Sequence, residues 1–149
     1  MGNDGKACEG RAGGAVMITF TIPGAPRGKG RPRYTGRGGF PRAYTDAKTR
    51  AYEQQVKEAY QRAGGPQYSG PVAVSITAIF EPPASLSQKK RTEMIGRYCG
   101  KKPDLDNIIK AILDGVNGVA FEDDTAVVVV TAQKIFGETA KAEVTISET

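Results

Sequence analysis

Histidine is absent from this sequence of 149 residues. Without an imidazole, the chain cannot use Ser-His-Asp or Cys-His catalysis, and it cannot build a histidine-ligated zinc site. Carboxylates, lysine, tyrosine and hydroxyl groups remain as candidate catalysts. Any enzyme chemistry in this chain therefore depends on these side chains.

Cysteine and long apolar segments are scarce as well. Cys8 and Cys99 lie far apart in the sequence, so neither a disulfide framework nor a cysteine-type zinc site is supported. No apolar run reaches the ~18 residues of a spanning helix, and no hydrophobic signal-peptide segment is found. We therefore expect a protein of the reducing cytoplasm that has no membrane partner.

Positive charge is in excess and unevenly distributed. The chain has 21 Lys and Arg against 16 Asp and Glu, a formal charge of +5 and a pI near 9.3, which makes a polyanionic partner plausible. Eight basic residues lie between Pro23 and Arg50, opposed there by a single acid, Asp46. This stretch is the expected contact surface for a polyanion.

Length and composition indicate one domain, because 149 residues with 39% hydrophobic content fall within the ~100–200 residues of an ordinary domain. Residues 1–16 are rich in glycine and small polar residues and show no helical or strand period. They predict a disordered N-terminal extension. The folded domain is expected to span residues 17–149.

Residues from about 23 to 45 are dominated by glycine, proline and arginine. This composition buries too little apolar area to order itself, which predicts a flexible basic loop. Arginine and lysine can contact phosphates and aromatic rings can stack on bases, so DNA binding is one interpretation. A solvated loop is the other that composition leaves open. The candidate DNA-binding residues are Arg27, Lys29, Arg31, Arg33, Tyr34, Arg37 and Arg42.

Apolar periodicity and turn residues predict elements in the order β-α-β-α-α-β-β. We expect a single α/β (α+β) domain in which helices pack on a mixed β-sheet. The expected strands are 16–22, 71–80, 126–136 and 140–147, and the expected helices are 47–62, 85 or 87 to about 98, and 104 to about 115–118. The short connection Gly137-Glu138-Thr139 suits a hairpin between the last two strands.

Two acids stand at the start of the third expected helix. Asp106, Lys110 and Asp114 align on one face at steps of four residues. Asp104 can converge with Asp106 only from outside the helix, because two residues rotate a helix by ~200°. Asp104 is therefore expected as the N-cap after Pro103, from which both carboxylates can point to one place.

A purely structural interpretation also explains these residues. Asp104 would cap the helix, Asp106 would interact with the helix dipole, and Lys110 with Asp114 would form an ion pair worth ~0.3–0.5 kcal/mol. Considered alone, the helix favours this interpretation, because D-x-D is a short and frequent pattern. It also leaves open whether Asp114 supports Lys110 or only faces solvent.

A second acidic group, Glu122-Asp123-Asp124, lies in the turn before the strand that begins at Ala126. Considered alone, it is an ordinary polar turn. Together the two groups supply carboxylates from two elements, with a lysine and without histidine, which suits Mg²⁺. Such a site can activate water to attack a phosphodiester, while Lys110 neutralises charge on the phosphoryl oxygens.

Four motifs strengthen the catalytic interpretation. They are Gly28-Lys29-Gly30-Arg31-Pro32-Arg33-Tyr34, then Lys102-Pro103-Asp104-Leu105-Asp106-Asn107-Ile108-Ile109-Lys110, then Leu113-Asp114-Gly115-Val116-Asn117, then Phe121-Glu122-Asp123-Asp124-Thr125-Ala126-Val127. In this order they resemble the RusA-type crossover-junction endodeoxyribonucleases of bacteria and their phages, over most of the chain from Met17. The motifs D-L-D-N-x-x-K and D-D-x-x-V, in this order and at this separation, are far more specific for this family than either motif alone.

The resemblance implies a homodimer that nicks opposed strands of a four-way (Holliday) DNA junction symmetrically, in recombination and repair. It implies Mg²⁺ as the cofactor, with Mn²⁺ as a substitute and no organic cofactor, and a bacterial or prophage origin. It implies catalytic roles for Asp104, Asp106, Lys110 and Asp124, and metal binding by Asp104, Asp106 and Asp124, with Asp123 as an additional candidate. Two other interpretations remain: a metal-dependent nuclease for other branched or flap DNA, and a non-catalytic basic DNA-binding module.

Overall fold

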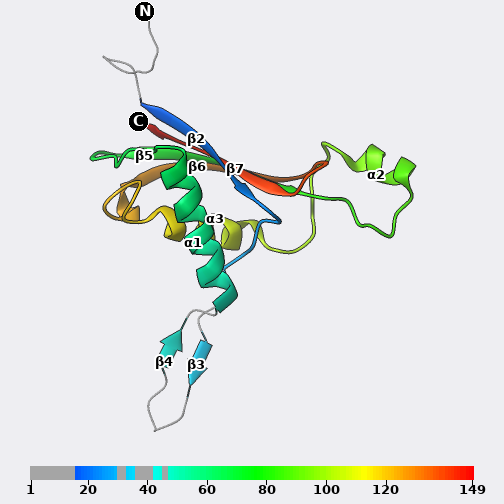
Figure 1. Ribbon diagram of the computed structural model, residues 1–149, viewed down its shortest axis with the longest axis horizontal. Helices are drawn as coiled ribbons and strands as arrows, with labels where there is room; N and C mark the ends of the chain where they lie inside the picture. The colour runs from blue at the N-terminus through cyan, green and yellow to red at the C-terminus, as the bar shows by residue number, and fades with distance from the viewer. Residues whose placement is uncertain (1–15, 30–32, 36–41, 45–46) are drawn as a thin grey trace, which may run out of the picture.

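The computed structural model describes residues 16–29, 33–35, 42–44 and 47–149. Its centre is a four-stranded sheet with the strand order β2-β7-β5-β6 (Figure 1). The strands are β2 (Met17–Pro23), β5 (Val72–Phe80), β6 (Val127–Phe136) and β7 (Lys141–Glu148). β7 pairs antiparallel with β2 and with β5, and β5 pairs parallel with β6. The predicted single mixed α/β domain is confirmed, while residues 1–15 of the predicted extension lie outside the described part.

Two helices, α1 (Ala47–Arg62) and α3 (Leu105–Val116), pack against each other on one face of the sheet (Figure 1). On α3, Ile108, Ile112 and Val116 of the predicted apolar stripe are fully buried. On β7, buried and partly exposed residues alternate, so that one face of the strand lies in the core. In the described part of the chain, no helix combines the length and the apolar character that crossing a bilayer requires.

Gly115 sets the distance between α1 and α3. A Cβ atom at this position would lie 2.7 Å from Cβ of Val56 and 2.9 Å from the backbone oxygen of Glu53. Both distances are shorter than non-bonded atoms allow, so only glycine lets the two helices meet here. The contact holds the last turns of α3 directly against α1.

The last two strands do not form the predicted hairpin. β5 lies between β6 and β7 in the sheet, so the connection from Phe136 to Lys141 crosses the end of β5. The N–H of Gly137 donates to the carbonyl of Phe80 at 2.9 Å, and a Cβ on Gly137 would come within 2.5 Å of the Ile79 side chain. The physical reason is that β5 gains a hydrogen-bonded neighbour on both sides, whereas a hairpin would leave it at an edge.

The second helix, α2, is shorter than predicted and covers Gln88–Met94 after the N-cap Ser87. It ends well before Tyr98. Gly96 follows with φ of 88°, and Tyr98 forms an antiparallel bridge with Ile135 of β6. The chain leaves the helix because its backbone groups find partners on the edge of β6.

A two-stranded antiparallel ribbon, β3 (Arg33–Thr35) and β4 (Arg42–Tyr44), lies within the segment predicted as a flexible loop. Figure 1 shows the ribbon extending away from the sheet, beyond the N-terminal end of α1. Residues 30–32, 36–41 and 45–46 of this segment lie outside the described part. The ribbon carries a basic stretch of the sequence away from the core.

Candidate active site

Asp104 occupies the N-cap position of α3, as predicted. Its backbone is extended, with φ −67° and ψ 143°, and its side chain makes no capping hydrogen bond. Asp104 is exposed, and within the described residues no group donates to its carboxylate. The structural interpretation required this side chain to cap the helix. Because it does not, the carboxylate stays available for a ligand.

Asp106 lies in the first turn of α3, and Lys110 and Asp114 follow on the next two turns. The Nζ atom of Lys110 lies 3.6 Å from Oδ1 of Asp114, and 57% of the Lys110 side chain is exposed. The predicted alignment of Lys110 with Asp114 is confirmed. An exposed pair of this kind contributes only ~0.3–0.5 kcal/mol, so Lys110 can exchange Asp114 for a phosphate at little cost.

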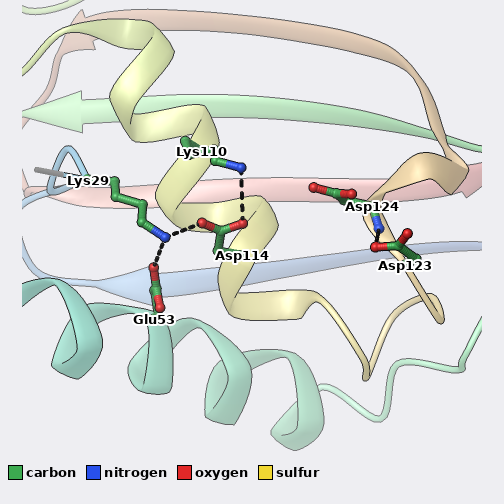
Figure 2. Close-up of polar contacts among 6 residues, drawn as sticks. All are labelled: Lys29, Glu53, Lys110, Asp114, Asp123 and Asp124. Atoms are coloured by element: carbon green, nitrogen blue, oxygen red, sulfur yellow. Dashed lines mark hydrogen bonds and ion pairs between the residues drawn. The ribbon is translucent and has the colours of Figure 1, made fainter. Parts of the chain in front are cut away.

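Asp114 does more than face solvent. Its Oδ2 atom lies 2.5 Å from Nζ of Lys29, and the same ammonium lies 3.1 Å from Oε2 of Glu53 on α1 (Figure 2). The side chains of Lys29, Glu53 and Asp114 are 21%, 21% and 17% exposed. Asp114 therefore bridges two lysines, one on each carboxylate oxygen. This ion cluster joins α1, α3 and the segment after β2.

The ion cluster keeps Lys29 charged. Burial would lower the pKa of its amine, but the hydrogen bonds and charges of Asp114 and Glu53 outweigh burial, so the pKa lies above its usual value. A raised lysine pKa means that the ion pairs stabilise the fold at neutral pH. The contribution of the Lys29 charge is lost as the pH rises through the raised pKa, in strongly alkaline solution.

The segment after β2 lies against the start of α3. The N–H of Lys29 donates to the carbonyl of Asn107 at 2.9 Å, and a Cβ on Gly28 would lie 3.0 Å from the side chains of Asn107 and Pro103. An open pocket of about 480 Å³ lies where the two segments meet. Its lining includes Arg27, Gly28, Lys29, Lys102, Asp104 and Asn107. Basic side chains and the Asp104 carboxylate thus share one pocket.

The turn before β6 gives Asp123 and Asp124 different roles. Asp123 is the N-cap of the short helix η2 (Asp124–Ala126): its Oδ1 accepts the N–H of Asp124 at 2.9 Å, and its Oδ2 accepts the hydroxyl of Thr125 at 3.4 Å. In the part of the chain that the structure describes, the Asp124 carboxylate has no such partner. Figure 2 shows it pointing toward the side of Lys110. Asp124 is therefore the better candidate for a ligand.

The chemistry of the donors fits a hard cation, because the carboxylates of Asp104, Asp106 and Asp124 offer oxygen ligands. Across residues 16–29 and 47–149, however, no three acid or cysteine side chains lie close enough together to hold a metal ion. Asp124 begins η2, which directly precedes β6, whereas Lys134, near the other end of β6, binds the carbonyl of Pro103. The predicted convergence of the three acids is not seen within the single chain.

The candidate DNA-binding residues fall into three groups. Arg27 is exposed beside the pocket of Asp104, and Lys29 belongs to the ion cluster. The backbones of Arg33, Tyr34 and Arg42 lie in the β3–β4 ribbon, and Arg31 and Arg37 lie outside the described residues. DNA binding by these residues stays a prediction.

Three residues near the site make contacts that are not predicted from the sequence. Glu53 completes the ion pairs of Lys29, the carbonyl of Asn107 accepts the N–H of Lys29, and Lys134 donates to two carbonyls before Asp104. Two of them carry a sequence signal: Asn107 belongs to the D-L-D-N-x-x-K motif, and Lys134 is the one charged residue in the sequence of β6. Glu53 resembles an ordinary helix residue, and only its tertiary partner gives it a role.

Replacing Lys29 with methionine tests whether Lys29 anchors the fold or binds DNA. The change leaves Glu53 and Asp114 without their shared cation, so the free energy of unfolding in urea should fall by about 1–3 kcal/mol. The salt dependence of DNA affinity should stay unchanged. In the matched variant Arg27→Met, stability should stay within about 0.5 kcal/mol and the salt slope should fall by about 1. The reverse pattern would make Lys29 a phosphate ligand.

Exposed carboxylates at a helix start, an exposed lysine and a basic pocket are groups that an enzyme acting on phosphodiesters can use. Comparison with known proteins agrees with this class. A family model described as "Endodeoxyribonuclease RusA" matches residues 23–147. The chain belongs to the RusA endodeoxyribonuclease family, as its motifs predict, and the family implies a nuclease that resolves Holliday junctions.

A second comparison extends the similarity to a full-length relative. A Bacillus subtilis (strain 168) protein described as "Uncharacterized protein YqaN" is 32% identical to this chain over 136 residues. The match covers 88% of this chain and 96% of that protein. The similarity therefore includes most of the sheet and the helices that carry the candidate site.

Proposed function

We propose that this protein is a Mg²⁺-dependent endonuclease that resolves four-way DNA junctions by paired, symmetric nicks. Its setting is recombination and repair in the cytoplasm of a bacterial host. The observation that carries the proposal is the N-cap of α3, where the carboxylate of Asp104 caps nothing and lines a basic pocket. The family supports the class of reaction, which is cleavage within a DNA strand.

In this proposal Asp104 and Asp106 are the metal ligands at the start of α3, and Asp124, which the described chain does not bring together with them, is the third acid of the family motif. A bound Mg²⁺ would stabilise the negative charge that develops on the phosphate during cleavage. Lys110, one turn beyond Asp106, neutralises charge on the phosphoryl oxygens. Asp114 holds the Lys110 ammonium on this face of α3 until a phosphate replaces it.

The basic residues around the pocket supply the DNA contact. Arg27 and Lys102 line the pocket together with Asp104, so a phosphate bound by their cations lies beside the carboxylate. The β3–β4 ribbon, which has Arg33 and Arg42 in its sequence, follows in the chain and extends away from the sheet (Figure 1). A four-way junction brings the phosphates of four arms close together, which suits a surface that reaches beyond one duplex.

Paired nicks require two active sites, and we propose a homodimer that supplies them. The outer strand β6 supports this part of the proposal. The side chains of Val128, Val129 and Val130 in β6 are 58%, 49% and 40% exposed, and β6 is the last strand of the described sheet. Residues 96–99 pair with the second half of β6, which leaves its first half, with the valines, as an open apolar edge, and such an edge pairs readily with another chain. A second copy of this protein would cover these valines.

The test is cleavage of a labelled synthetic four-way junction, with nicks mapped on all four strands. We expect nicks at symmetric positions on two opposed strands in Mg²⁺, and none after EDTA removes the metal. Three-way junctions and flaps with the same arm sequences should be cut at least about tenfold more slowly. A plasmid cruciform should be linearised, because coordinated nicks cut both strands, whereas independent sites leave nicked circles. Equal cleavage of flaps, or activity in EDTA, would reject the proposal.

A further inference from the structure

Lys134 binds the segment that leads into Asp104 at three points. Its Nζ atom donates to the carbonyl of Lys101 at 2.6 Å and to the carbonyl of Pro103 at 2.8 Å. Its own carbonyl accepts the N–H of Cys99 at 2.9 Å. One residue of β6 therefore holds three peptide groups of the short segment that precedes α3.

An ammonium group is well suited to holding this segment. It has three donors, and hydrogen bonds from a charged donor are stronger than those from a neutral one. Residues 99–103 belong to neither a helix nor a strand, so their carbonyls have no partner in a helix or a sheet. Without the ammonium, the hydrogen bonds of the described chain would hold this segment only at Cys99 and at α3, and Gly28 would pack against Pro103 without a hydrogen bond to it.

The peptide group of Pro103 links this anchor to the candidate site. The carbonyl of Pro103 and the N–H and Cα atoms of Asp104 belong to the same planar unit, so holding the carbonyl also restrains the position of these two groups of Asp104. The Asp104 side chain cannot provide this restraint itself, because it makes no capping hydrogen bond. The direction in which its carboxylate leaves the N-cap therefore depends on the segment that Lys134 holds.

We propose that Lys134 is a positioning residue of the nuclease, which holds Asp104 in its catalytic orientation through the carbonyls of Lys101 and Pro103. The inference rests on the proposed function, because it takes Asp104 as a catalytic residue. It adds a residue outside the acidic motifs and on a different element from Asp104. Lys134 acts without contacting DNA, since two of its donors are already bound within the protein.

Three variants test this role. Lys134→Met keeps the length of the side chain and removes its donors, Lys134→Arg keeps a cationic donor, and Gln133→Met changes an exposed neighbour on the opposite face of β6. In Lys134→Met, kcat on the four-way junction should fall by about 10–100-fold, while KM and junction affinity stay within about twofold of wild type. Lys134→Arg should recover most of the loss, and Gln133→Met should behave as wild type.

Hydrogen exchange provides a measurement that does not depend on cleavage. In Lys134→Met the amides of residues 100–106 should exchange faster, while those of β5 and β7 keep their wild-type rates. A near wild-type kcat, a parallel loss of junction affinity, no recovery by arginine, or unchanged exchange would each overturn the role of Lys134. If the wild-type protein does not cleave the junction, the proposed function fails instead, and the exchange rates still test the restraint on residues 100–106.

Discussion

Replacing Asp104 or Asp106 with asparagine is expected to slow junction cleavage at least about 10³-fold, a loss of about 4 kcal/mol in transition-state stabilisation. Asparagine keeps the size and the N-cap preference of aspartate but removes the negative charge. The fold should therefore persist, and junction affinity should stay within about threefold of wild type. Single-turnover cleavage and gel-shift titration of one labelled junction measure the two quantities.

Glu122→Gln is the matched control, because Glu122 is an exposed acid in the turn that carries Asp124. It should cleave at the wild-type rate. Asp124→Asn tests whether this turn contributes to the same site as Asp104. A loss of cleavage rate equal to that of Asp104→Asn supports a shared site, whereas a wild-type cleavage rate would show that Asp124 is not part of it. Near wild-type cleavage by both Asp104→Asn and Asp106→Asn would reject the carboxylate assignment. A parallel loss of junction binding would give these acids a binding or structural role.

Gly115→Ala is expected to have the largest effect on stability. The free energy of unfolding should fall by about 2–3 kcal/mol and Tm by roughly 5–12 °C, although alanine is favoured over glycine within a helix by about 1 kcal/mol. The new methyl group would lie 2.7 Å from Cβ of Val56 and 2.9 Å from the backbone oxygen of Glu53. A backbone oxygen cannot rotate away, so α1 and α3 have to separate.

Calorimetry and urea denaturation measure this effect, and Gly70→Ala is the control. Nothing lies within 4 Å of a Cβ built on Gly70, so its stability should stay within about 0.5 kcal/mol of wild type. Separation of the two helices should also weaken the ion cluster, because Glu53 lies on α1 and Asp114 on α3. A stabilised Gly115→Ala variant would contradict the helix contact described above.

The third helix illustrates what local sequence can predict. The spacing of its apolar residues predicts the buried positions Ile108, Ile112 and Val116, because an isolated stretch already has the helical period. The aspartate after Pro103 predicts the N-cap at Asp104, since aspartate favours that position for local reasons. The hydrogen bonding of the Asp104 side chain, however, is not predicted from the local sequence. The capping bond expected from residue type is absent.

The incorrect predictions concern contacts between distant segments. The second helix was expected to reach Tyr98, but Tyr98 bridges Ile135 of β6 instead. The last two strands were expected to pair, but β5 lies between them. In both cases local propensity allowed the predicted structure, and a backbone partner far along the chain provided a better one.

The sequence by itself determined which chemistry is available: carboxylates and lysines without histidine, a basic segment, and the motifs of a nuclease family. Only the tertiary structure decided which of these groups meet. It places Lys29 between Glu53 and Asp114, and it binds the peptide before Asp104 to a lysine of β6. The physical reason is that residue types act locally, whereas these contacts arise from the burial of apolar surface across the whole chain.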